Sequence, residues 1–176
     1  MNMNIPEELG RIISSLKGLE CWYVRFGGAA GSTFQLALGG KVRRPVRLKN
    51  PAHSDEFRQF EGQVGLFVWC AWRLDSTVGP VTSWDDTNES AEAGLEKLIG
   101  TRIDTVEVVP PAWDMNIEFS NSLCLRVFCD HVPGEPSFDG NWDVRTQDMS
   151  IAVGPGTQCR SERRVRSKNS AGVKSP

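Results

Sequence analysis

Cysteine, aspartate and histidine follow one another at residues 129–131, at the end of an apolar stretch that reads LCLRVF. A thiol and an imidazole support nucleophilic catalysis when the two groups face each other. Because successive side chains of a strand point to opposite faces, Cys129 and His131 are expected to share one face and Asp130 to lie on the other. These residues are therefore candidates for a hydrolase or transferase site. The alternative is a buried thiol before a polar turn, which the following VPGEP favours.

The histidines and cysteines show no spacing that is typical of a metal site. The chain has two histidines, and His53 lies in a polar loop far from His131. Cys159 could join Cys129 and His131, but this set lacks the paired ligand spacing of zinc sites. Five cysteines, an odd number without a C-x-x-C motif, are typical of reduced thiols. We therefore expect no metal and no cofactor.

A second group of residues suits binding to another protein. In SWDDTNES (83–90), Trp84 precedes Asp85 and Asp86 directly before a predicted helix, and Trp113 and Asp114 lie in similar loop-like sequence. We expect one of the two tryptophans to be exposed, because exposed Trp beside acidic residues is typical of an interface anchor. The two consecutive aspartates could instead bind a cation, or cap the helix and oppose its dipole.

The charge of the chain is unevenly distributed. Residues 160–176 contain six Lys and Arg residues and one Glu, a formal +5, so the other 159 residues carry −7 of the total of −2. This pattern predicts an acidic body with a basic, flexible tail over residues 157–176. The tail lacks interleaved aromatic residues and the body repels phosphate, so nucleic acid is not the expected partner.

The elements that would position these residues are short helices and alternating strands. One helix is expected to begin at Asn4 and end at Gly18, and a second to begin at Asn88 or Ser90 and end at Gly100. Their buried faces would carry Leu and Ile in the first and Ala91, Leu95 and Leu98 in the second. Strands are expected near 20–27, 33–38, 42–48, 64–74, 102–109, 114–120, 123–129, 141–146 and 149–154. The run 64–72 within the strand expected near 64–74 is apolar on both faces, which is typical of a central strand covered on both sides.

Two stretches repeat the same pattern 82 residues apart: SSLKGLECWYVRF (14–26) and EKLIGTRIDTVEV (96–108). The sequence therefore predicts an α+β fold of two tandem pseudo-repeats, residues 1–87 and 88–156. Each is a short helix followed by three to four mostly antiparallel strands. Because one such half is marginal alone, the two should pack as one globular unit around a β-rich core. The alternative is a chance likeness between two helix–Gly–strand segments. The sequence leaves sheet order, and barrel or sandwich, open.

The ends and apolar runs of the chain favour a soluble, cytoplasmic protein. The start MNMNIPEELG has two acids, a proline and no apolar core of a secretory signal. The longest uncharged apolar run, VGLFVWCAW (64–72), is far shorter than the roughly 20 residues that span a bilayer. No membrane association is expected.

Several longer strings resemble a known group of proteins. GAAGSTFQLALG (28–39), RRPVRLKNP (43–51), FEGQVGLFVWCAWRL (60–74), LCLRVFCD (123–130) and NWDV (141–144) are similar to small bacterial proteins of uncharacterised function. The resemblance covers most of residues 20–154. These proteins are similar in style to immunity proteins of polymorphic toxin systems, which bind and neutralise a toxin without catalysis. The resemblance implies a toxin partner and assigns no residue roles.

Three functions therefore stay open at the level of sequence. The first is a non-enzymatic protein-binding protein, with an acidic body that suits a basic partner such as a toxin. The second is a hydrolase or transferase that uses Cys129 and His131. The third is a self-associating structural module, in which exposed strand edges pair into a homodimer.

Overall fold

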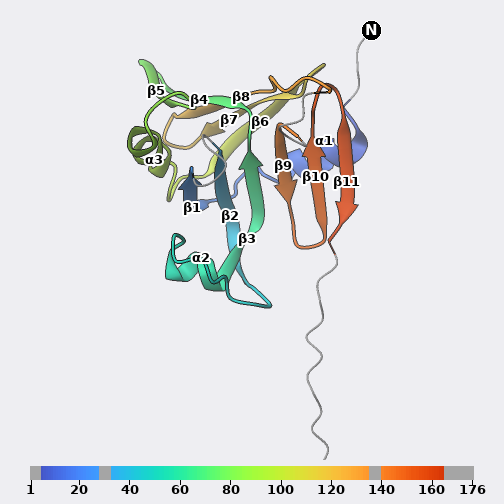
Figure 1. Cartoon of the computed structure of the whole chain (residues 1–176). Coiled ribbons are helices and arrows are strands. Elements are labelled where there is room, and N and C mark those ends of the chain that lie inside the picture. The colour runs from blue at the N-terminus through green and yellow to red at the C-terminus, as the bar shows by residue number, and fades with distance from the viewer. Residues whose placement is uncertain (1–4, 28–32, 135–139, 165–176) are drawn as a thin grey trace, which may run out of the picture.

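The computed structural model describes residues 5–27, 33–134 and 140–164, and these residues form an α+β fold with two antiparallel sheets (Figure 1). The helices are α1 (Glu7–Ser14), α2 (Asp55–Gln59) and α3 (Asn88–Glu96). The strands are β1 (Cys21–Phe26), β2 (Phe34–Arg43), β3 (Phe60–Val68), β4 (Ala71–Ser76), β5 (Gly79–Ser83), β6 (Ile103–Val109), β7 (Asp114–Phe119), β8 (Cys124–Phe128), β9 (Trp142–Arg145), β10 (Met149–Val153) and β11 (Cys159–Arg163). The predicted α+β class with antiparallel strands is confirmed.

Each sheet combines strands from both halves of the chain. The six-stranded sheet has the order β1-β2-β3-β9-β10-β11, and the five-stranded sheet has the order β5-β4-β8-β7-β6. The joins are β3 with β9, where Leu66 pairs with Val144, and β4 with β8, where Trp72 pairs with Val127. Neither half of the chain therefore forms a sheet of its own.

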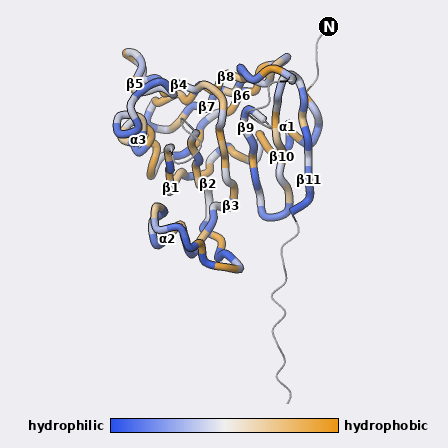
Figure 2. Tube along the Cα trace, viewed as in Figure 1, coloured by the Kyte–Doolittle hydropathy of each residue, from blue (hydrophilic) through white to orange (hydrophobic). Residues whose placement is uncertain are grey.

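One hydrophobic core lies between the two sheets and includes α1 and α3. The ring of Trp72 on β4 meets the rings of Phe26 on β1 and Phe34 on β2 edge-on, with centroids 5.8 and 5.0 Å apart. Helix α1 packs on β6 and α3 packs on β1 and β5, so each helix covers a strand of the other half. In Figure 2 hydrophobic residues run along the central strands, whereas the edge strand β11 is mostly hydrophilic.

The left-handed conformation predicted for the glycines after the two helices is confirmed, although α1 ends at Ser14 and α3 ends at Glu96, before these glycines. Gly18 and Gly100 have φ values of 81° and 82°, in the left-handed region that glycine adopts without strain. Helix α3 begins after Thr87, whose Oγ1 accepts a hydrogen bond from the Ser90 N–H at 3.3 Å, so the predicted caps Asn88 and Ser90 were wrong. Asn4, the predicted start of the first helix, lies outside the described residues, and α1 begins at Glu7 after Pro6.

The segments that follow these glycines lie side by side and exchange backbone hydrogen bonds. The exchange has a regular form, because each donor and acceptor has a counterpart 82 positions along the chain. The four bonds run from Gly18 N–H to Ile103 O, Gly100 N–H to Cys21 O, Cys21 N–H to Thr101 O and Ile103 N–H to Leu19 O, at 2.7, 2.7, 2.8 and 3.0 Å.

The prediction of a single central strand over 64–74 was wrong. The chain leaves the six-stranded sheet after β3 and enters the five-stranded sheet at β4, and between them the N–H groups of Trp69 and Cys70 both donate to Asn141 O. The stretch is apolar on both faces because Phe67 and Trp69 stack away from the common core, with centroids 6.0 Å apart, whereas Trp72 lies inside it. The short strand expected near 42–48 is instead the end of β2 and a loop before α2.

The flexible tail was predicted to begin too early. Residues 159–163 form β11, which pairs with β10 at the edge of the six-stranded sheet. An edge strand needs only one partner and tolerates charged side chains, so CRSER carries little of the alternation that marks a buried strand. The remainder of the predicted tail, residues 165–176, lies outside the described residues. The sequence also failed to indicate α2 and β5.

Candidate functional site

Cys129 lies at the end of β8, where its polar groups are held by the β6–β7 turn. Its N–H donates to Oδ1 of Asp114 at 2.7 Å, and its thiol donates to the Trp113 carbonyl at 3.2 Å. The Trp142 indole N–H donates to the same carbonyl at 3.0 Å. Trp113 has a positive φ of 70°. The thiol of Cys129 is therefore a hydrogen-bond donor that joins β8 to this turn.

A second thiol lies beside it. The hydrogen bond with Cys129 and the burial of the side chain both raise the pKa of Cys70, and the former effect is the larger. Neither cysteine is in a disulfide. At neutral pH Cys70 is therefore a thiol and not the thiolate that a nucleophile requires.

Asp130 and His131 make their contacts with the neighbouring strands. Oδ1 of Asp130 accepts the Ala71 N–H at 3.3 Å and lies 3.9 Å from Nε2 of His131. Since a carbonyl only accepts, Nδ1 of His131 donates to Gly140 O at 2.9 Å, which leaves Nε2 without a proton in the neutral ring. The His131 N–H donates to Oδ1 of Asn141 at 3.0 Å. The structure thus gathers the predicted triplet at one strand end, with the thiol directed at a backbone carbonyl.

Trp84 is exposed at the turn between β5 and α3. Its exposed fraction is 46%, and Asp85 and Asp86 beside it are also exposed. Oδ2 of Asp86 accepts hydrogen bonds from Oγ1 of Thr82 at 2.8 Å and from the Ser83 N–H at 2.9 Å. These two bonds, in that order, lower the pKa of Asp86. Asp86 therefore fixes the turn that presents Trp84 and Asp85.

The other two predicted partner-binding residues, Trp113 and Asp114, pack into the structure. Trp113 is only 2% exposed, and its indole N–H donates to Thr157 O at 2.9 Å. Asp114 is half-buried and bonded to the Cys129 N–H. The prediction that one of the two tryptophans is exposed is confirmed by Trp84. The turn folds Trp113 and Asp114 into the structure, so their side chains offer a partner little surface, and their role in binding stays a prediction.

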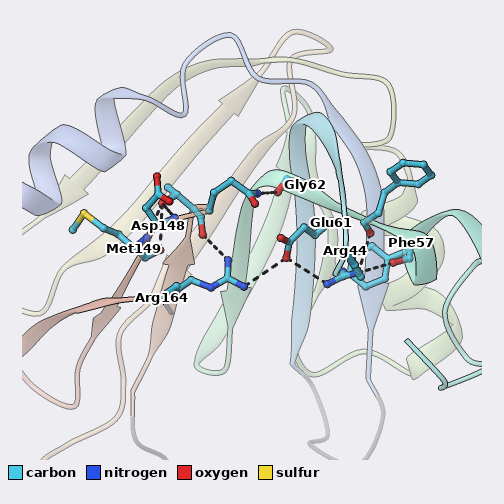
Figure 3. Close-up of polar contacts among 10 residues, drawn as sticks. Arg44, Phe57, Glu61, Gly62, Asp148, Met149 and Arg164 are labelled. Carbon is cyan, nitrogen blue, oxygen red and sulfur yellow. Dashed lines mark hydrogen bonds and ion pairs between the residues drawn. The ribbon is translucent and has the colours of Figure 1, made fainter. Parts of the chain in front are cut away.

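The outer face of the six-stranded sheet carries a second candidate site that the sequence analysis missed. A cavity of about 100 Å³ opens there, lined by Arg44, Arg145 and Arg164. Glu61 lies between Arg44 and Arg164 (Figure 3). We call it the guanidinium pocket, after these three arginines. They come from the end of β2, from β9 and from the residue after β11, so no local sequence pattern could have indicated the site.

A buried carboxylate lies next to the guanidinium pocket. Asp143 is 4% exposed, its Oδ2 accepts from Nη2 of Arg145 at 2.7 Å, and its Oδ1 has no hydrogen-bond partner. Burial raises the pKa of Asp143, and the hydrogen bond and charge of Arg145 oppose that effect. The pair places a partly desolvated charge on the outer face of the sheet.

Helix α2 lies over the neighbouring part of the same face. The Phe57 ring stacks on Tyr23 with centroids 4.0 Å apart, and the Tyr23 hydroxyl bonds Nδ1 of His53 at 2.8 Å. Burial raises the pKa of Tyr23 to about 12 and lowers that of His53. His53, expected in a polar loop, therefore anchors the loop to the sheet.

Within the described ranges, no group of three or more His, Cys, Asp and Glu side chains is arranged to hold a metal ion. No helix among those residues is both long and apolar enough to cross a bilayer. Comparison with known protein families, curated proteins and solved structures gave no match.

Proposed function

We propose that this chain is a non-enzymatic protein-binding protein whose contact surface centres on Trp84 and the acidic turn between β5 and α3. The observation that carries the proposal is the 46% exposure of Trp84 on a turn held by Asp86. An aromatic side chain on a rigid support loses little conformational entropy on binding, and tryptophan is enriched among the residues that dominate interface energies.

The chemistry of the surroundings suits a basic partner. Asp85, next to Trp84, and Glu89 in the first turn of α3 are exposed, and residues 1–164, which include β11, carry a formal charge of −5. Electrostatic attraction between an acidic surface and a basic protein raises the association rate and makes it sensitive to salt. A basic toxin, with this chain as its immunity protein, is the form of the proposal that the sequence resemblance suggests.

The support beneath the turn is tightly packed. Thr82, which bonds Asp86, is buried at 3% exposure against Gly94 of α3. A Cβ atom at position 94 would lie 2.3 Å from Cγ2 of Thr82, so glycine is what allows the helix to approach the strand. This packing fixes α3 and β5, and therefore the turn between them.

We also infer that the two halves are pseudo-repeats that have exchanged strands. The four backbone bonds between segments 82 residues apart support this, as does the packing of each helix on the first strand of the other half. The inference explains the size of the scaffold, because neither half could bury its apolar faces alone.

The proposal is tested by affinity capture from extract of the native cells at low and moderate salt. The wild-type chain should retain one basic protein in stoichiometric amount, and the Trp84→Ala variant should lose it. The matched control is Val109→Ala, which removes part of a side chain that is 39% exposed on β6. Capture of no stoichiometric protein at either salt concentration, or equal capture by both variants, would overturn the proposal.

A further inference from the structure

We infer that the guanidinium pocket binds a small oxyanion of the phosphate class through Arg44, Arg145 and Arg164. This inference is independent of the proposed protein partner, since the pocket lies on the outer face of the six-stranded sheet and Trp84 follows β5 of the other sheet. It rests on the charge of the lining, on the way each guanidinium is held, and on the shape of the floor.

The lining has more positive than negative charge. The lining holds three guanidiniums and the Glu61 carboxylate, and the Asp143 carboxylate bonds Arg145 beside it, so the formal surplus is one positive charge. Glu61 is shared: its Oε2 lies 3.5 Å from both Nη1 of Arg44 and Nη2 of Arg164, which is longer than the roughly 2.7–2.9 Å of a tight ion pair. Neighbouring cations that are partly removed from water are unfavourable unless an anion compensates them.

Arg44 is fixed before any ligand binds. Its Nε donates to the carbonyls of Phe57 and Phe60 at 3.0 and 3.1 Å, and its guanidinium lies 4.6 Å above the Phe57 ring. Only 15% of its side chain is exposed. Burial lowers the pKa of Arg44, and this effect is larger than the opposing effect of the Glu61 charge. The buried guanidinium charge is therefore incompletely compensated, and an additional anion would stabilise it.

Arg145 and Arg164 are held in comparable ways. The guanidinium of Arg145 lies 4.3 Å above the Phe67 ring and bonds Asp143 with one nitrogen. The Arg164 N–H donates to Asp148 O at 2.8 Å, and its Nη1 donates to Thr146 O. Guanidinium groups whose positions are set in advance lose little entropy when they bind an oxyanion, and their geometry matches phosphate oxygens.

The floor of the pocket leaves space for one small group. Gly62 and Gly65 of β3 contribute no side chains, and a Cβ atom at position 62 would lie 2.6 Å from Val64 O, so the backbone excludes a larger residue there. The cavity of about 100 Å³ has room for several water molecules and therefore for a single tetrahedral anion.

A larger hollow adjoins the pocket across Gln35 and Phe67, which line both. It measures about 320 Å³, and its lining includes His53, Asn50 and Trp69. The oxyanion could therefore be free, or it could be the phosphoryl head of a monoester with a ring. Both sources share the chemistry that the three arginines recognise.

The test is calorimetric titration of the full-length protein with inorganic phosphate, and separately with phenyl phosphate, at constant ionic strength in chloride. The variant Arg164→Gln removes a cation that is 35% exposed at the end of the sheet. The matched control Arg163→Gln removes the same charge from the adjacent residue, which does not line the pocket. Circular dichroism and the Tm in chloride alone establish that each variant is folded.

We expect saturable binding of phosphate to the wild type, weakened about tenfold or more by Arg164→Gln and less than twofold by Arg163→Gln. Tighter binding of phenyl phosphate would identify the monoester as the natural form, and equal or weaker binding the free anion. If Arg164→Gln is misfolded, thermal shifts of the wild type decide: phosphate should raise its Tm above that in chloride of equal ionic strength. No saturable binding by the wild type, or equal loss in the two variants, would overturn the inference.

Discussion

Glu20 and Arg102, separated by 82 positions in the chain, are partners in a single antiparallel bridge, and Nη2 of Arg102 lies 3.0 Å from Oε2 of Glu20. Four backbone hydrogen bonds surround this pair, and they link the two segments that follow the helix-ending glycines. The side chains of both residues are substantially exposed, at 45% and 62%. The backbone, and not the ion pair, should therefore stabilise this junction.

The first prediction separates these two contributions. Gly18→Ala and Gly100→Ala should each lower the free energy of unfolding by about 1–2 kcal/mol, because alanine is strained at positive φ. A Cβ atom at either position would meet no atom within 4 Å, so backbone strain is the only cause. Replacing both Glu20 and Arg102 by alanine should change the free energy of unfolding by less than about 1 kcal/mol. Urea unfolding measures all three, and a larger effect of the ion pair would contradict this account.

The second prediction concerns the thiols. Burial raises the pKa of Cys21 to about 12, and the Cys129 contact and burial raise that of Cys70. Iodoacetamide at neutral pH should therefore label both residues far more slowly in the folded protein than in urea. Cys129, whose thiol donates to the Trp113 carbonyl, should also be slow. Peptide mass spectrometry over time measures each site. Rapid labelling of Cys129 in the folded state would instead favour the hydrolase or transferase hypothesis.

The third prediction is a pH effect of Asp143. Burial raises the pKa of this group above its ordinary 3.8, so the ionised carboxylate opposes folding. The stability associated with the protonated form is present below pH 3.8 and is lost as pH rises through the folded-state value. The free energy of unfolding of the wild type, relative to Asp143→Asn, should therefore fall from acid to neutral pH. A difference that rises with pH would mean that the bond to Arg145 outweighs burial.

The fourth prediction concerns Asp75, whose contribution to stability should depend on pH in the opposite direction to that of Asp143. The hydrogen bond from Arg73, followed by the contributions of Arg126, lowers the pKa of Asp75 below 3.8 on the outer face of the five-stranded sheet. Its stabilisation is present above that pH and is lost as pH falls through the folded-state value. Asp75→Asn should therefore destabilise the protein at pH 7, and the effect should shrink in acid. Urea unfolding of the wild type and Asp75→Asn at pH 7 and in acid measures this effect. A difference in the free energy of unfolding that does not change with pH would contradict the lowered pKa of Asp75.

The sequence could predict the features that depend on local patterns. Glycine after a helical run indicated the left-handed residues Gly18 and Gly100, and helical periodicity identified Ala91, Leu95 and Leu98, which are fully buried. The strands expected near 20–27 and 33–38 correspond to β1 and β2, which pair in antiparallel orientation.

Features that depend on distant partners were beyond local patterns. The crossing between sheets at Trp69 and Cys70 looks like a continuous strand because both outer and inner faces are apolar there. Trp113 appeared to be in a loop, but its burial requires Thr157 from another part of the chain. The guanidinium pocket draws on residues as far apart as Arg44 and Arg164, which only the order of the sheet brings together.

The central claim is that Trp84 and the acidic turn form the contact surface for a basic protein. The most direct measurement is the equilibrium affinity of the captured partner for the wild type, Trp84→Ala and Val109→Ala across a range of salt concentrations. We predict that Trp84→Ala weakens binding by at least about 2 kcal/mol, that Val109→Ala leaves it nearly unchanged, and that salt weakens binding of the wild type. Equal affinities of the three chains, without salt dependence, would contradict the claim.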